Sequence, residues 1–171
     1  MDTREQAPSS DVTAARQALA DHRWNDAFEL LSKADAEGRL GPEDLRAFAE
    51  AAWFTAHADL AIELKERAFK AYLDRGDRID AAALAVDVGH EYAMKRKGSI
   101  AGAWVSRAER LLEKEPESFA HGYLALARSD AAEARGDFDE AVALAERATE
   151  IGSSSKMRTS RPGGSSNAVR A

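Results

Sequence analysis

The stretch that decides the fold is GDFDEAVALAERATEIG, residues 136–152. Its alanines Ala141 and Ala148 are seven residues apart, which is two turns of an α-helix, so both lie on one helix face. Two small residues on one face allow a second helix to approach closely. The stretch therefore predicts one half of a tightly packed helix pair.

The same pair of alanines occurs three more times upstream. These pairs begin at Ala27, Ala61 and Ala101, and the first alanines of the four pairs are separated by 34, 40 and 40 residues. A recurring period of this length is typical of helical repeats. The segment before each pair also has helical periodicity, so residues 11–20, 43–56, 81–94 and 122–135 are predicted to form the first helix of each unit. The predicted fold is all-α, an antiparallel helix-pair α-solenoid of about eight helices.

Composition excludes several classes of protein. The 171 residues allow one domain with a sizeable core. The sequence contains no cysteine, which excludes disulfides and cysteine nucleophiles and is compatible with a reducing cytoplasm. The N-terminal residues have no apolar signal-peptide region, and no stretch approaches the 18 apolar residues of a membrane span. We therefore expect a cytoplasmic protein without a membrane partner.

Charge and patterning divide the chain into three parts. The net charge is −6, but residues 153–171 carry four basic and no acidic residues, which leaves −10 on residues 1–152. This acidic body argues against direct nucleic acid contact. We expect a disordered N-terminus over residues 1–10, a helical-repeat domain over 11–152, and a tail over 153–171 that is either disordered or an out-of-frame reading of a longer solenoid. The last helix then lacks a capping neighbour over Val142, Leu144 and Ala145 and could self-associate.

Several residues give the chain a resemblance to tetratricopeptide (TPR) repeats, which are helix–turn–helix units of 34 residues. The fourth repeat has Gly136, Asp137, Phe138, Ala141 and Ala148 at signature positions, and the third has Gly89 and Tyr92. The chain departs from the family in its two 40-residue periods and its missing repeat-end prolines.

Longer stretches, including AGAWVSRAERLLEKEPES (101–118), resemble the helical-repeat region of bacterial LuxR-family transcription regulators. That resemblance implies a sensor or scaffold fragment that lacks the DNA-binding domain. Two alternatives remain open. One is a stand-alone TPR scaffold that binds a peptide or helix, and the other is a regulatory segment associated with a class III nucleotide cyclase or an ATPase.

The sequence shows no catalytic apparatus. The motifs GxSxG, GxGxxG and GxxxxGK[ST] are absent, and none of the four histidines belongs to an HExxH motif. Acidic runs such as EKEPE (113–117) fit the first turn of a helix. We expect no enzyme activity, no cofactor and no metal site.

The expected partner is a protein or peptide. If the repeat register holds, the first helix of each unit lines a concave groove. Most aromatic residues, including Trp53, Phe54, Tyr92, Trp104, Phe119 and Tyr123, are expected to serve packing. The mixed groove surface nevertheless suits a peptide or helix better than an anion. The residues assigned to this groove are Arg46, Glu50, Trp53, His90, Tyr123 and Asp130, together with Val86 and Leu126.

Overall fold

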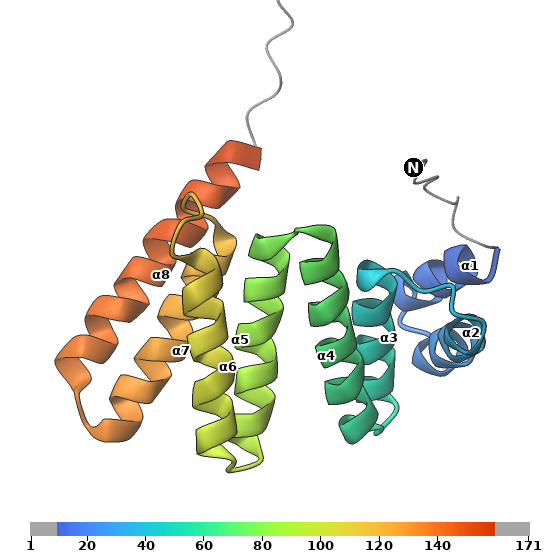
Figure 1. Ribbon diagram of the computed structural model, residues 1–171, viewed down its shortest axis with the longest axis horizontal. Helices are drawn as coiled ribbons and strands as arrows, with labels where there is room; N and C mark the ends of the chain where they lie inside the picture. The colour runs from blue at the N-terminus through green and yellow to red at the C-terminus, as the bar shows by residue number, and fades with distance from the viewer. Residues whose placement is uncertain (1–9, 160–171) are drawn as a thin grey trace, which may run out of the picture.

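A computed structural model describes residues 10–159 of the chain, which form eight α-helices and no strand within that range (Figure 1). The helices are α1 (Ser10–Ala20), α2 (Trp24–Ala36), α3 (Pro42–Phe54), α4 (Ala58–Arg75), α5 (Arg78–Met94), α6 (Gly98–Leu112), α7 (Phe119–Arg135) and α8 (Phe138–Thr159).

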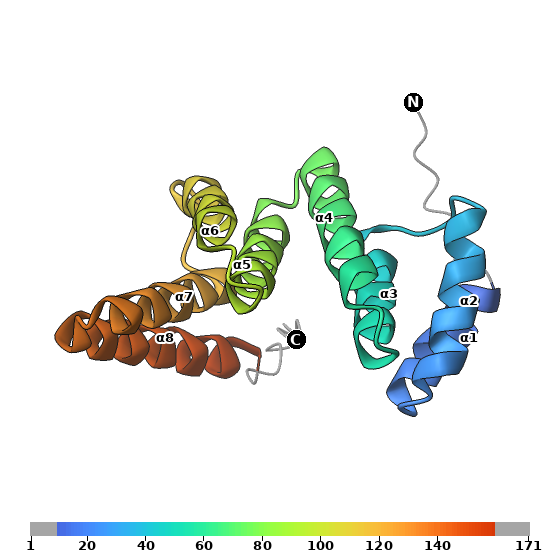
Figure 2. The same cartoon turned by 90° about the horizontal axis from the view of Figure 1, so that it is seen from below.

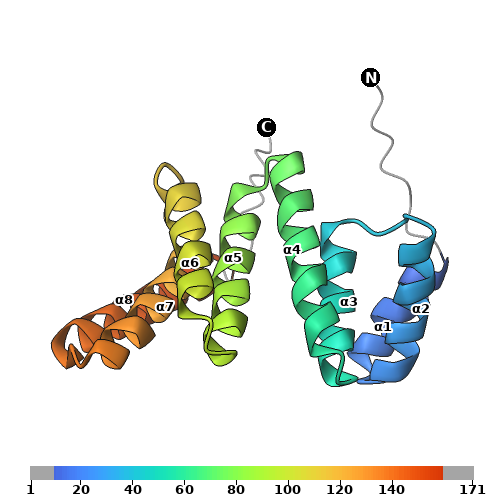
Figure 3. The same cartoon turned by 60° about the horizontal axis from the view of Figure 1, so that its bottom comes forward.

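The helices pack as four consecutive pairs, α1–α2, α3–α4, α5–α6 and α7–α8. Further contacts between α2 and α3, α4 and α5, and α6 and α7 join each pair to the next. Figure 2 shows α3, α5 and α7 on one side of the molecule and α4 and α6 on the other, and Figure 3 shows α3–α4 and α5–α6 as neighbouring pairs. The predicted all-α helix-pair solenoid is confirmed.

Small residues bring the helices of each pair together. A Cβ atom added to Gly89 of α5 would lie 3.3 Å from the carbonyl oxygen of Ala101 in α6, which leaves no room for a larger residue. A Cβ atom on Gly122 of α7 would lie 3.4 Å from Cγ2 of Ile151 in α8. All eight alanines of the predicted pairs are buried: Ala27, Ala34, Ala61, Ala68, Ala101, Ala108, Ala141 and Ala148.

The same turn links the two helices of every pair. Its central residue is left-handed, with φ of 57° at His22, 64° at Ala56, 57° at Arg96 and 81° at Gly136. The next residue donates its backbone N–H to a carbonyl five residues back, as Asp137 does to Ala132 at 3.0 Å. These bonds satisfy carbonyl groups at the end of the first helix in the manner of a Schellman motif. The same turn also follows α2 at Gly38 and α4 at Gly76, so it is shared by six of the eight described helices.

The first helices of neighbouring pairs contact each other except at one place. Among the described helices, α1 touches α3 and α5 touches α7, but α3 and α5 make no contact, and α4 lies between them (Figure 2). The core accordingly forms two large clusters that meet at α5. One is built mainly from α1 to α4, and the other from α5, α6 and α7.

The predicted domain boundary after residue 152 falls inside a helix, because α8 continues to Thr159. Ile151 is buried against Gly122, close to the start of α7, so α8 runs on past the beginning of its partner helix. The loss of apolar periodicity therefore marks where α8 leaves α7 and not where the helix ends. At the other end, α1 includes Ser10, while the remaining predicted tail residues, 1–9 and 160–171, lie outside the described range.

The exposed surface differs in part from the expected one. Trp104 is buried and Tyr92 half-buried, but Trp53, Phe54, Phe119 and Tyr123 are exposed. Phe54 still packs, since it stacks on Trp24 of α2, whereas the expectation of core packing is wrong for Trp53, Phe119 and Tyr123.

On α8, Val142 is exposed whereas Leu144 and Ala145 are half-buried. Self-association through this face stays a prediction. None of the helices in the described range is long and apolar enough to cross a membrane.

Candidate functional site

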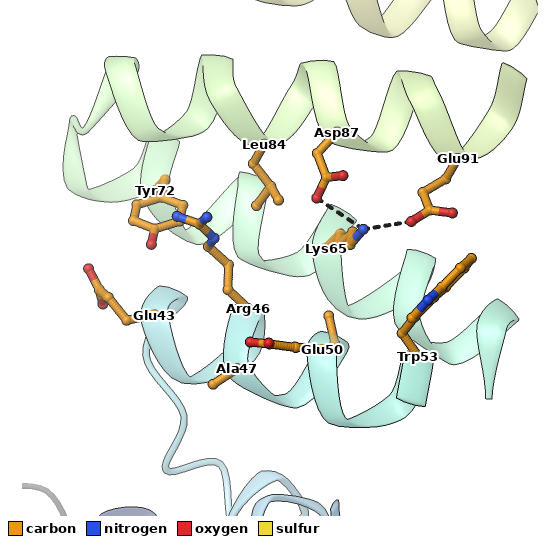
Figure 4. Close-up of a pocket in the computed structure, with 11 residues that line it drawn as sticks. Glu43, Arg46, Ala47, Glu50, Trp53, Lys65, Tyr72, Leu84, Asp87 and Glu91 are labelled. Atoms are coloured by element: carbon orange, nitrogen blue, oxygen red, sulfur yellow. Dashed lines mark hydrogen bonds and ion pairs between the residues drawn. The ribbon is translucent and has the colours of Figure 1, made fainter. Parts of the chain in front are cut away.

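A cleft of about 510 Å³ opens between α3 and α5, where these helices do not touch (Figure 4). Helix α4 forms its floor through Lys65 and Tyr72. The lining residues are Glu43, Arg46, Ala47, Ala49, Glu50, Trp53, Lys65, Tyr72, Leu84, Asp87 and Glu91.

Charged side chains on both walls explain why the cleft stays open. Arg46, Glu50 and Trp53 are spaced at i, i+4 and i+7, so they form one stripe along α3. Asp87 and Glu91 form the corresponding stripe on α5. Closing α3 onto α5 would remove these charges from water, and a buried charge without a partner is strongly unfavourable. Water in the cleft avoids that cost.

An ion cluster ties the floor of the cleft to its α5 wall. The Nζ atom of Lys65 lies 2.7 Å from Oε1 of Glu91 and 2.9 Å from Oδ2 of Asp87 (Figure 4). Glu91 is almost fully buried, whereas the Asp87 side chain is half exposed. Burial by itself lowers the pKa of Lys65, but the hydrogen bond to Glu91 and the charge of Asp87 outweigh it and raise the pKa above the ordinary lysine value. Lys65 is therefore a charged, fixed ammonium.

The other end of the cleft is built around Tyr72. Arg46 extends toward the Tyr72 ring (Figure 4), and the Arg75 guanidinium lies 5.4 Å from the centre of that ring. Burial raises the pKa of the Tyr72 hydroxyl, and its hydrogen bond with Arg46 opposes that rise. Glu43 pairs with both terminal nitrogens of Arg75, and that hydrogen bonding lowers the pKa of the Glu43 carboxyl. Arg46 forms no ion pair with a carboxylate in the described part of the chain.

A second cleft of about 400 Å³ continues the first toward α7. Its α7 wall is a stripe of Tyr123, Leu126 and Asp130, again spaced at i, i+3 and i+7. The Tyr123 ring is held edge-on by Phe119 at 5.9 Å between ring centres. The two clefts form one continuous groove, because they share three lining residues, Arg46, Leu84 and Asp87.

The structure brings all of the sequence-assigned groove residues together. Three of them, Arg46, Glu50 and Trp53, line the first cleft, and Arg46 also lines the second. The remaining groove residues all line the second cleft, and they are Val86, His90, Tyr123, Leu126 and Asp130. Binding of a partner at any of these residues stays a prediction.

Sequence reasoning missed the ion cluster of Lys65, Asp87 and Glu91. Lys65 belongs to the second helix of its pair, which a regular solenoid places on the outer side, so the repeat register gave no reason to assign it to the groove. It reaches the groove because α3 and α5 are apart. A signal was present in the i, i+4 spacing of Asp87 and Glu91, which puts two carboxylates on one face of α5.

The histidines have separate roles. His90 lines the second cleft, and His57 stacks on Phe28 at 4.6 Å. His121 accepts a hydrogen bond from the Ser118 backbone N–H at 3.1 Å in the capping box of α7. Among the described residues, no group of three or more His, Asp or Glu side chains is placed to hold a metal ion.

No protein-family model matches the chain, and no curated protein matches it at a significant level of similarity. The groove must therefore be interpreted from its own side chains.

Proposed function

We propose that the chain is a non-catalytic protein-interaction module that holds a segment of a partner protein in the groove formed by α3, α5 and α7. One observation carries this proposal. Three large side chains line the same groove while exposed to solvent: Trp53 by 42%, Tyr123 by 52% and Leu126 by 47%. Tryptophan and tyrosine are the residues that contribute most often and most strongly to binding energy at protein interfaces.

The shape of the groove supports an elongated partner over a small molecule. Its two clefts are open and run one into the other across three helices. An extended or helical peptide can follow such a surface and place alternate side chains in successive depressions. The sequence resemblance to LuxR-family regulators supports a regulatory role for this binding in the cytoplasm, where partner occupancy would be passed to an effector domain.

An array of random 12-residue peptides tests the proposal. Peptides retained by the full chain are labelled with fluorescein, and their dissociation constants are measured by fluorescence polarisation. The double variant Trp53→Ala, Tyr123→Ala should bind them at least about tenfold more weakly, since each anchor side chain contributes more than about 1 kcal/mol.

Phe138→Ala is the matched control, because Phe138 is also an exposed aromatic residue but lies on α8 and lines neither cleft. Circular dichroism should show the same helix content for all variants. Equal affinities of the double variant and the parent chain would disprove groove binding.

A further inference from the structure

The α3 end of the groove holds an exposed aromatic ring, that of Trp53. Trp24 stacks on Phe54 at 4.1 Å between ring centres, and Trp104 lies under the Arg107 guanidinium at 4.3 Å. Trp53 differs from both: within residues 10–159 it makes no ring–ring or cation–π contact, and it is exposed in the cleft. An indole face is the strongest aromatic site for a cation, and no Arg or Lys of residues 10–159 makes a cation–π contact with this one.

Carboxylates line the same cleft as this ring. Glu50 is three residues before Trp53 on the same stripe of α3, is exposed, and forms no ion pair with any described residue. Glu91 lies across the cleft on α5 (Figure 4). Glu91 and Asp87 both pair with the single ammonium of Lys65, so this cluster of two carboxylates and one cation has a net negative charge.

The first cleft as a whole is also net negative, like the ion cluster. Four acidic side chains and two basic ones line it, and Arg75 next to the cleft pairs with Glu43, so the net charge is −1. The second cleft adds Asp130 without a further Lys or Arg. Arg46 lies two helical turns from Trp53, or about 10 Å along α3. It repels a cation at its own end of the cleft and thereby favours the Trp53 end.

We infer that the groove selects a basic segment of its partner protein, with one Arg or Lys side chain seated on the Trp53 ring in the cleft that Glu50 and Glu91 also line. The ring attracts the cation through its quadrupole, and the net negative charge of the cleft favours a cation there. Leu84, Tyr123 and Leu126 take the apolar side chains that follow in the same segment. This inference rests on the proposed function and adds the chemistry of the ligand.

The test uses the peptides selected from the random array. Arg and Lys should be enriched over Asp and Glu among bound peptides, at one position of their alignment. Replacing that Arg by Gln in a selected peptide should weaken binding about tenfold, and replacing it by Glu should weaken it further. In the Trp53→Ala, Glu50→Gln variant, the Arg peptide and the Gln peptide should bind within about twofold of each other.

Glu133→Gln is the control, because Glu133 is exposed on α7 and lines neither cleft, and this variant should keep the full preference for Arg. Peptides that bind in the groove with equal affinity whether they carry Arg, Gln or Glu overturn the inference and leave the proposed function standing. A chain that retains no peptide from the array overturns both.

Discussion

Helix α5 has a closed junction with α7 on one side and an open cleft toward α3 on the other. On the α7 side, α5 contributes small or branched apolar residues such as Ala83 and Val86 to a core cluster that includes Leu124 of α7, and these two residues also line the second cleft above that cluster. On the α3 side, the facing residues are Asp87 and Glu91 on α5 and Glu50 on α3. The two helices thus share an apolar core beneath the second cleft, whereas charged side chains face each other across the first.

The closed junction should be the more sensitive of the two to truncation. Leu124 is only 7% exposed within its core cluster. Leu124→Ala should lower the free energy of unfolding by about 2–4 kcal/mol, through lost apolar burial and the cavity that remains. Urea denaturation followed by circular dichroism measures the change.

Leu126→Ala is the matched control on the same helix, because Leu126 is half exposed in the groove. Its effect should stay within about 0.5 kcal/mol. Equal losses for the two leucines would show that the α7 wall of the second cleft is packed as tightly as the core cluster beneath it.

Within the cleft between α3 and α5, substitutions in the ion cluster should also lower the free energy of unfolding strongly. Glu91→Ala removes the buried carboxylate and leaves Lys65 with Asp87 alone, so we expect a loss of about 1–3 kcal/mol in unfolding free energy. Glu50→Ala, another glutamate of the same cleft, should change it by less than about 0.5 kcal/mol, since Glu50 is exposed and unpaired among the described residues. A Glu50 effect as large as that of Glu91 would show that α3 and α5 approach each other more closely than this structure has them.

High pH should weaken the same cluster by a smaller amount. The pKa of Lys65 is raised in the folded chain, so its contribution to stability is complete below the ordinary lysine pKa of 10.5 and is lost as the pH rises through the folded value. Tyr72 and Tyr92 also have raised pKa values and act in the same direction from about pH 10 upward. The urea midpoint should therefore fall between pH 10 and pH 12.

The variant Lys65→Met isolates the lysine contribution to this pH dependence. Its urea midpoint should fall less steeply than that of the parent chain over the same pH range, because the contribution of Lys65 is gone while those of Tyr72 and Tyr92 remain. Identical slopes for the two proteins would show that the Lys65 ammonium is not held by its two carboxylates.

The helix pairs could be predicted from sequence because they depend on a local property. Ala141 and Ala148, two turns apart, specify a close helix neighbour wherever they occur, and the four copies of this spacing gave four pairs. The α3–α5 gap could not be predicted in that way. The cleft at this gap is lined by Lys65, Asp87 and Glu91, which come from two helices and become one cluster only after folding.

The exposed aromatic residues show a second limit. Helix α3 carries two stripes at helical spacing, one with Leu45, Phe48 and Ala52 and the other with Arg46, Glu50 and Trp53. Periodicity alone predicts a core position for Phe48 and for Trp53 equally well. The register of the repeat separates them, since it assigned the second stripe to the groove, and the structure places that stripe in the cleft.

The left-handed turns have a consequence for how this chain can change. Three of the four turns within the helix pairs carry His22, Ala56 or Arg96 where the fourth has Gly136. A left-handed backbone is unfavourable for any residue with a Cβ atom and free of that penalty for glycine. A single Gly replacement at one of these three turns removes that backbone penalty and can therefore raise the free energy of unfolding. Ala56 and Arg96 line neither cleft, so Gly replacements there can compensate for destabilising substitutions made to alter what the groove binds, whereas His22→Gly would also remove the contact of His22 with Trp24.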